Sequence, residues 1–273
     1  MFKRQFTMIY NTIIRIPSWI IIVSFLIPVY FMYSRGISFS FSDNFWENLY
    51  CDGYLLRLWV PTALLVLLSG FGVSKEDDAV RFLRMKNRKT VARTNLFSAL
   101  FVTVLFVVLI TIIYALFFRI SQGFSLADDW SGQLVKYGEL NEIGGNTFPA
   151  PFVISSFSPI GAMAVELLFL IFYCFFLAIL SMTINAVFKQ SVGSIICIFV
   201  EMAVALFGRR TYQEYSLYPF YNGSFRLLTE NNNLEFVNYS IIYWIILLSA
   251  IIVLYHIVMR KVDLISLSRE NQV

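Results

Sequence analysis

The stretch that decides the fold runs from Pro159 to Phe188 and reads PIGAMAVELLFLIFYCFFLAILSMTINAVF. Its only charged residue is Glu166. A helix that spans a lipid bilayer needs about 20 predominantly apolar residues, and a longer run is accommodated by tilting. This stretch therefore predicts a tilted transmembrane helix.

Apolar runs of the same kind lie on both sides of it. Over the whole chain, 58% of the 273 residues are hydrophobic and only 14% are charged, whereas soluble domains carry about 25% charged residues. The two longest segments between apolar runs, 119–158 and 208–237, are too short to bury a core of their own. We therefore predict an all-α, polytopic membrane protein with a single transmembrane domain, residues 1–273. The other five predicted spans are Pro17–Tyr33, Leu55–Val73, Leu96–Phe118, Val192–Phe207 and Tyr239–Met259.

The positive charges predict the orientation of these six spans. If the N-terminus is cytosolic, 14 of the 21 lysines and arginines face the cytosol, as the positive-inside rule requires. The basic segment Met1–Ile16 runs into the first span without a small-residue cleavage site, so we expect a retained, amphipathic interfacial helix. The prediction is a multi-pass protein of the plasma membrane of a bacterial cell, with both termini in the cytosol. The residues left outside are Arg35, Arg57, Arg119, Lys136, Arg209, Arg210 and Arg226.

Several classes of chemistry have no support in the sequence. The three cysteines are far apart, and His256 is the only histidine, so no metal site or catalytic residue is predicted. A net charge of +4 does not favour a nucleic-acid partner. No G-x-x-x-x-G-K-[ST] motif occurs, so the chain has no phosphate-binding loop and no cofactor of its own.

The cytosolic segment Ser74–Arg93, SKEDDAVRFLRMKNRKTVAR, is the most informative loop. Ser74 can cap a helix, and the acidic cluster Glu76–Asp78 then fills the first turn, where the helix dipole favours anions. Apolar residues follow along one side, and cations gather at the far end. This pattern predicts a short amphipathic docking helix that breaks near Asn87. The alternative is ordinary positive-inside charge, which explains the cations but not the acidic turn or the apolar side.

The same segment resembles the coupling helix of ABC type-2 permeases, which docks on a cytosolic ATPase subunit. The matching residues are Glu76–Asp78, then Val80–Met85, then Asn87 to Lys89, although the glycine usual after the acidic residue is missing here. The resemblance implies six spans, a separate ABC ATPase that binds ATP and magnesium, and a second permease copy, identical or related. It assigns ATPase coupling to Glu76, Asp77, Asp78, Arg81, Phe82, Arg84, Met85, Lys86 and Arg88.

A second candidate site lies in the outer half of the predicted spans. Glu166 and Glu201 are intramembrane carboxyl groups, and such groups are expensive enough to suggest a function. Together with Arg57, Arg209 and Arg210 they predict a polar cluster at the outer gate of a pathway. The alternative is that Arg57 extends to the headgroups and that each glutamate pairs with a basic neighbour to hold the bundle together.

The segment 208–237 contains Pro219, Gly223 and several aromatic residues. We expect short re-entrant helices on the outer side, as in the type-2 family, because irregular backbone can enter the membrane only under cover of protein or water. A plain surface loop with an aromatic belt is the alternative.

These features predict the permease subunit of an ABC exporter, a protein that is not itself an enzyme. Small permeases of bacteriocin and phenol-soluble modulin exporters have a similar size, which favours amphipathic or antimicrobial peptides as substrates; lipids and hydrophobic drugs are alternatives. A non-transporting membrane scaffold or immunity protein is the main rival. An intramembrane protease is disfavoured because it needs more than one histidine.

Overall fold

The computed structural model describes residues 44–51, 53–69, 88–123, 125–132, 135, 151–188, 192–207, 217–225 and 235–261. Within these ranges the chain is helical with no strand, so the prediction of an all-α fold is confirmed for this part of it. The predicted first span, the N-terminal helix Met1–Ile16 and residues 74–87 of the docking segment lie outside the described residues.

Within the described residues, three helices are long and apolar enough to cross a membrane. They are α6 (Arg88–Gln122), α9 (Pro159–Phe188) and α13 (Glu235–Lys261). Two shorter apolar helices, α4 (Gly53–Leu67) and α10 (Val192–Phe207), correspond to the predicted second and fifth spans. The fold therefore supports a membrane-embedded protein, and the number of spans stays a prediction.

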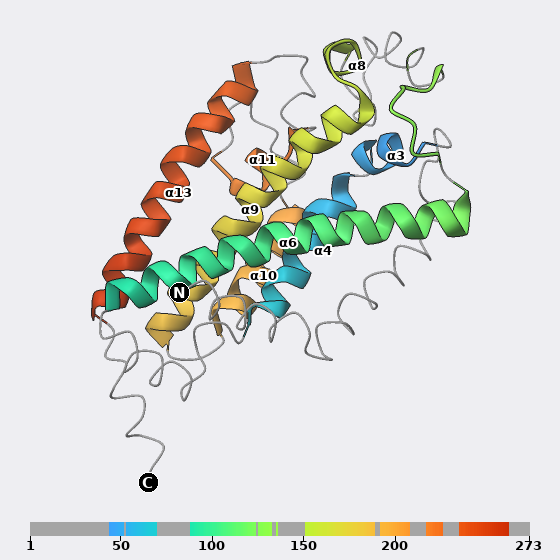
Figure 1. Ribbon diagram of the computed structural model, residues 1–273. Coiled ribbons are helices and arrows are strands. Elements are labelled where there is room, and N and C mark those ends of the chain that lie inside the picture. The colour runs from blue at the N-terminus through green and yellow to red at the C-terminus, as the bar shows by residue number, and fades with distance from the viewer. Residues whose placement is uncertain are drawn as a thin grey trace.

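Helix α9 is the centre of the structure. It packs against α10, α13, α6 and α4. Of its apolar 18-residue stretch, 56% is buried, whereas only 17% of the corresponding stretch of α13 is buried. Figure 1 shows α6 crossing in front of α9, with the N-terminal end of α6 beside the C-terminal end of α13. A hydrogen bond of 3.2 Å from Asn95 Nδ2 to the Tyr255 hydroxyl joins those two ends.

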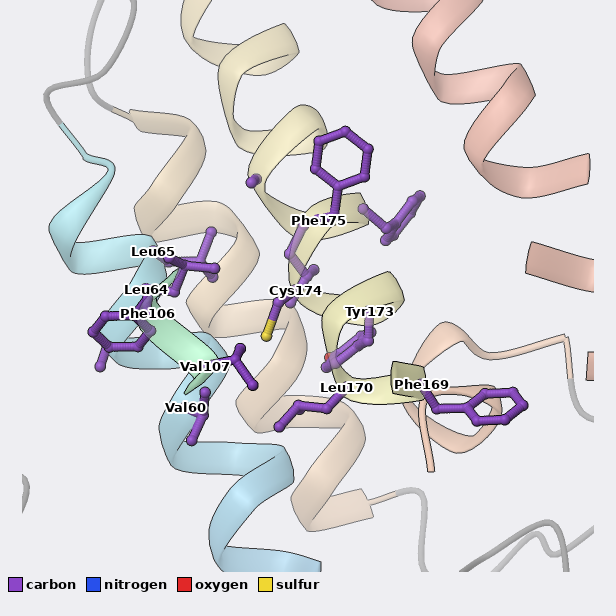
Figure 2. Close-up of a cluster of buried hydrophobic side chains, with 14 of the residues drawn as sticks. Val60, Leu64, Leu65, Phe106, Val107, Phe169, Leu170, Tyr173, Cys174 and Phe175 are labelled. Atoms are coloured by element: carbon purple, nitrogen blue, oxygen red, sulfur yellow. The ribbon is translucent and has the colours of Figure 1, made fainter. Parts of the chain in front are cut away.

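The core lies where α4, α6 and α9 meet. Val60 and Leu64 of α4 and Phe106 of α6 are at most 5% exposed there, and Leu170 and Cys174 of α9 belong to the same cluster (Figure 2). Because apolar residues cover every side of these helices, the buried sides are selected by the neighbouring helices and the remaining sides stay apolar and exposed. Apolar exposed sides of this kind suit a lipid solvent.

Three short helices complete the described fold. They are α3 (Phe45–Cys51), α8 (Pro151–Ser156) and α11 (Pro219–Asn222). Helix α3 packs against α9 and α6, and α11 contacts α9, α10 and α13.

Candidate functional site

Glu166 lies in the first third of α9, with none of its surface exposed. Its Oε1 accepts a hydrogen bond of 2.8 Å from the Ser224 hydroxyl. Ser224 lies two residues after the end of α11, so the carboxyl group ties this short segment to the central helix. A buried carboxyl oxygen left without a donor would cost about 1–3 kcal/mol or more, and the serine offsets part of that cost.

Asn222, the last residue of α11, connects the same segment to α13. Its Oδ1 accepts a hydrogen bond of 2.5 Å from the Ser240 hydroxyl, and its backbone carbonyl accepts one of 2.7 Å from Trp244 Nε1. Its Nδ2 donates to the Tyr218 carbonyl at 3.2 Å and closes the turn. Residues 217–225 are thus held by polar contacts to both α9 and α13.

The segment 217–225 reaches the middle of α9. A Cβ atom on Gly223 would lie only 2.8 Å from Tyr173 Cβ, so the backbone of the segment lies directly against that residue. The Phe220 ring meets the Tyr173 ring edge to face at 6.1 Å, and the Phe225 ring stacks on Phe169 at 6.4 Å. Non-helical backbone can lie at membrane depth where protein covers it, and α9 and α13 provide such a cover here.

Glu201 of α10 forms a second, separate site with α4. Its side chain is 2% exposed, and its Oε2 lies 3.3 Å from the Thr62 hydroxyl. Its Oε1 has no hydrogen-bond partner in the part of the chain that the structure describes. Tyr173 and Cys174 on α9 lie within electrostatic range of this carboxyl group. Figure 2 shows Cys174 pointing from α9 toward α10.

A third cluster, at α3, was not predicted. Asn44 Nδ2 donates to the carbonyls of Ala127 and Asp129 at 2.9 and 3.1 Å. Trp46 Nε1 donates to the Leu126 carbonyl at 3.3 Å, and the Ser131 amide donates to Glu47 Oε1. The start of α3 is therefore bound to the loop that follows α6.

The same loop also holds the start of α9. Asp128 Oδ1 accepts a hydrogen bond of 2.9 Å from the Ile160 amide, in the first turn of α9. Trp130 Nε1 donates to the Phe157 carbonyl at 2.7 Å. We name residues 125–132 the strap, because they link α3 to the N-terminal end of α9. Most of these partners lie about 80 residues apart in sequence, and no local pattern predicts such a pairing.

The predicted outer-gate residues are only partly placed. Glu166 and Glu201 are both buried, but they do not share a partner. Glu166 is hydrogen-bonded to Ser224, after α11, and Glu201 to Thr62 of α4. Arg57 belongs to α4, and its side chain is outside the described part. Arg209 and Arg210 also lie outside the described residues. The partner found for Glu201 is a threonine rather than a basic residue.

Of the predicted ATPase-coupling residues, Arg88 is the first residue of α6, and the other eight lie outside the described residues. Residues 88–93, predicted as the end of the docking segment, are continuous with α6, which starts eight residues before the predicted third span. The described residues include no group of three or more His, Cys, Asp or Glu that could hold a metal ion.

Comparison with models of known protein families, with curated proteins and with solved structures finds no significant match for this chain.

Proposed function

We propose that this chain is the membrane-spanning permease subunit of an ATP-driven exporter. It would work with a separate ABC ATPase and with a second permease copy in the same membrane. The observation that carries the proposal is the segment 217–225, which packs against the middle of α9 and is hydrogen-bonded to α9 and α13. A short covered helix beside apolar spans suits the outer end of a transport pathway better than a surface loop does.

The sequence supplies the other half of the proposal. The segment Ser74–Arg93 combines an acidic first turn, an apolar side and a basic end, which suits docking on a cytosolic partner. ATP hydrolysis in that partner would move this segment, and α6 begins within it at Arg88. Because α6 packs on α9, α4 and α13, such a motion would be passed to the core of the bundle.

The substrate class that suits this chain best is an amphipathic peptide. The described helices expose large apolar side chains on α6, α10 and α13, and the only two acidic residues on α9 and α10 are buried. A substrate with an apolar face could enter from the lipid along such helices. The rival function, a scaffold or immunity protein without transport, requires the same membrane helices but no ATPase.

The first test is co-purification. The tagged chain, extracted from its native membranes in mild detergent, should carry a stoichiometric ATPase whose activity is inhibited by vanadate. A chain that purifies alone after gentle crosslinking would contradict the exporter and favour the scaffold.

The second test addresses the docking segment. Replacing Arg81, Arg84 and Lys86 with alanine should abolish ATPase co-purification and transport, because the cationic end of the docking helix is lost, while membrane insertion stays normal. A matched control replaces Arg260, Lys261 and Arg269 with alanine. This substitution removes the same amount of positive charge from the predicted cytosolic side. Transport that survives the first triple variant would rule out this segment as the coupling element.

A further inference from the structure

The Thr62 hydroxyl has a single proton but lies near two hydrogen-bond acceptors, the Leu58 carbonyl and the Glu201 carboxyl group. The Thr62 hydroxyl lies 2.7 Å from the Leu58 carbonyl and 3.3 Å from Glu201 Oε2. A threonine hydroxyl has one proton to donate and two lone pairs that accept. Since O–H···O bonds have their most common length near 2.7–2.8 Å, the shorter contact favours donation to the Leu58 carbonyl. One proton cannot serve both acceptors fully, so the hydrogen bond from Thr62 to Glu201 Oε2 is the weaker of the two.

Among the described residues, an ionised Glu201 would therefore have at most one donor, the Thr62 hydroxyl, which it would share with the Leu58 carbonyl. Its Oε1 has no hydrogen-bond partner in that part of the chain. No lysine or arginine occurs in α9, in α10 or in residues 58–67 of α4. A buried carboxylate with one long, shared hydrogen bond and no cation among these residues is strongly destabilised.

We propose that Glu201 and Thr62 form a proton-binding site buried between α4 and α10. Glu201 holds the proton on Oε2 and donates it to the Thr62 hydroxyl, which in turn donates to the Leu58 carbonyl. Every proton in this short relay then has an acceptor, and the unpartnered Oε1 belongs to a neutral carboxyl group instead of a charged one. The inference does not depend on the exporter, because it concerns the resting state of the chain alone.

The surroundings of the site suit a neutral acid. Cys197, one turn before Glu201 on α10, and Tyr173 and Cys174 on α9 lie within electrostatic range of this carboxyl group, and none of these side chains is cationic. On α4, Arg57 is the one charged residue near the site in sequence, and its side chain is not among the described ones.

Infrared difference spectroscopy of the purified full chain in detergent tests the proposal. The spectrum of wild type minus Glu201→Gln, recorded at neutral pH, should contain the carbonyl band of a neutral carboxylic acid. Glutamine is a close mimic of the protonated acid, because its amide can donate to Thr62 in the same way, so this variant should fold and elute as the wild type does. Carboxylate bands without an acid band would overturn the proposal.

Two further variants keep the test valid whatever Glu201→Gln does. Thr62→Val removes the acceptor and should shift the acid band toward that of an acid without a hydrogen bond, whereas Thr62→Ser should leave it in place. Glu166→Gln, a buried carboxyl with a different partner, should not remove the band. An acid band that is identical in Thr62→Val and Thr62→Ser would show that Thr62 does not accept the proton and would overturn the relay.

Discussion

At the scale of single residues, the close approach of segment 217–225 to α9 depends on the glycine at position 223. Gly223 has a φ of −84°, which any residue can adopt, so its role is steric and not conformational. A Cβ atom there would meet Tyr173 Cβ at 2.8 Å and the Pro219 carbonyl at 3.2 Å. The first contact is with an atom that every residue other than glycine carries, so trimming the tyrosine ring would not relieve it.

Replacing Gly223 with alanine should therefore destabilise the protein by about 1–3 kcal/mol through overpacking. The expected result is a lower thermal unfolding midpoint in detergent, measured by tryptophan fluorescence, because Trp244 packs beside the same segment. Gly132 is the matched control, since a Cβ atom there meets nothing within 4 Å. If Gly223→Ala and Gly132→Ala unfold at the same temperature, the segment does not pack on Tyr173 as described.

At the scale of elements, α9 and α10 form a hairpin that is joined by polar side chains. The hydroxyls of Ser181 and Ser194 lie 2.8 Å apart, and the Gly193 amide donates to Asn185 Oδ1 at 2.7 Å. Small and polar residues are the usual means by which helices approach closely in a membrane, where lipid removes the hydrophobic drive for association. A Cβ atom on Gly193 would clash with the Ser181 carbonyl and with Asn185 Oδ1.

Gly193→Ala should separate the two helices at this end and weaken both hydrogen bonds. We expect a loss of roughly 1–3 kcal/mol, visible as a lower unfolding midpoint and as faster proteolysis between α9 and α10. Gly161→Ala, in the first turn of α9, serves as the control, because its added Cβ atom would come no nearer than 3.3 Å to another atom, the Ser158 hydroxyl. Equal stability of the two variants would contradict the close hairpin.

At the scale of the whole molecule, the exposed surfaces of α6 and α13 are apolar. On α13, Ile242, Ile245 and Ile246 are 58–63% exposed, while Trp244 between them is 1% exposed. On α6, Phe97 and Phe101 are exposed in the same way. In water such surfaces would promote aggregation, so their natural solvent is lipid.

Spin labels test this arrangement in a reconstituted bilayer. With the three native cysteines replaced, a label at Ile245 or Ile246 should be relaxed by oxygen dissolved in the lipid and not by a water-soluble nickel complex. A label at Phe101 should behave alike, because it lies on the exposed side of α6. Strong relaxation by the nickel complex at Ile245 would mean that α13 does not face lipid.

Span-like helices could be predicted from the sequence alone because the criterion is local. The predicted bounds Pro159–Phe188 and Val192–Phe207 coincide with α9 and α10. The prediction for the second span was less accurate: α4 ends at Leu67, whereas the apolar run continues to Val73. Apolar length shows that a segment can be a helix in lipid, but it does not show where the helix ends.

The sequence by itself therefore determined that the chain suits a lipid environment, that its fold is helical and that Glu166 and Glu201 are unusual carboxyl groups within apolar runs. Each of these points follows from the composition of one stretch of sequence. Only the tertiary structure decided that Glu166 meets Ser224, that Glu201 meets Thr62 and that the strap holds α3 against α9. Those partners lie 58, 139 and 83 residues apart. Helices that are apolar on every side carry no pattern that selects a neighbour, so their partners are set by packing.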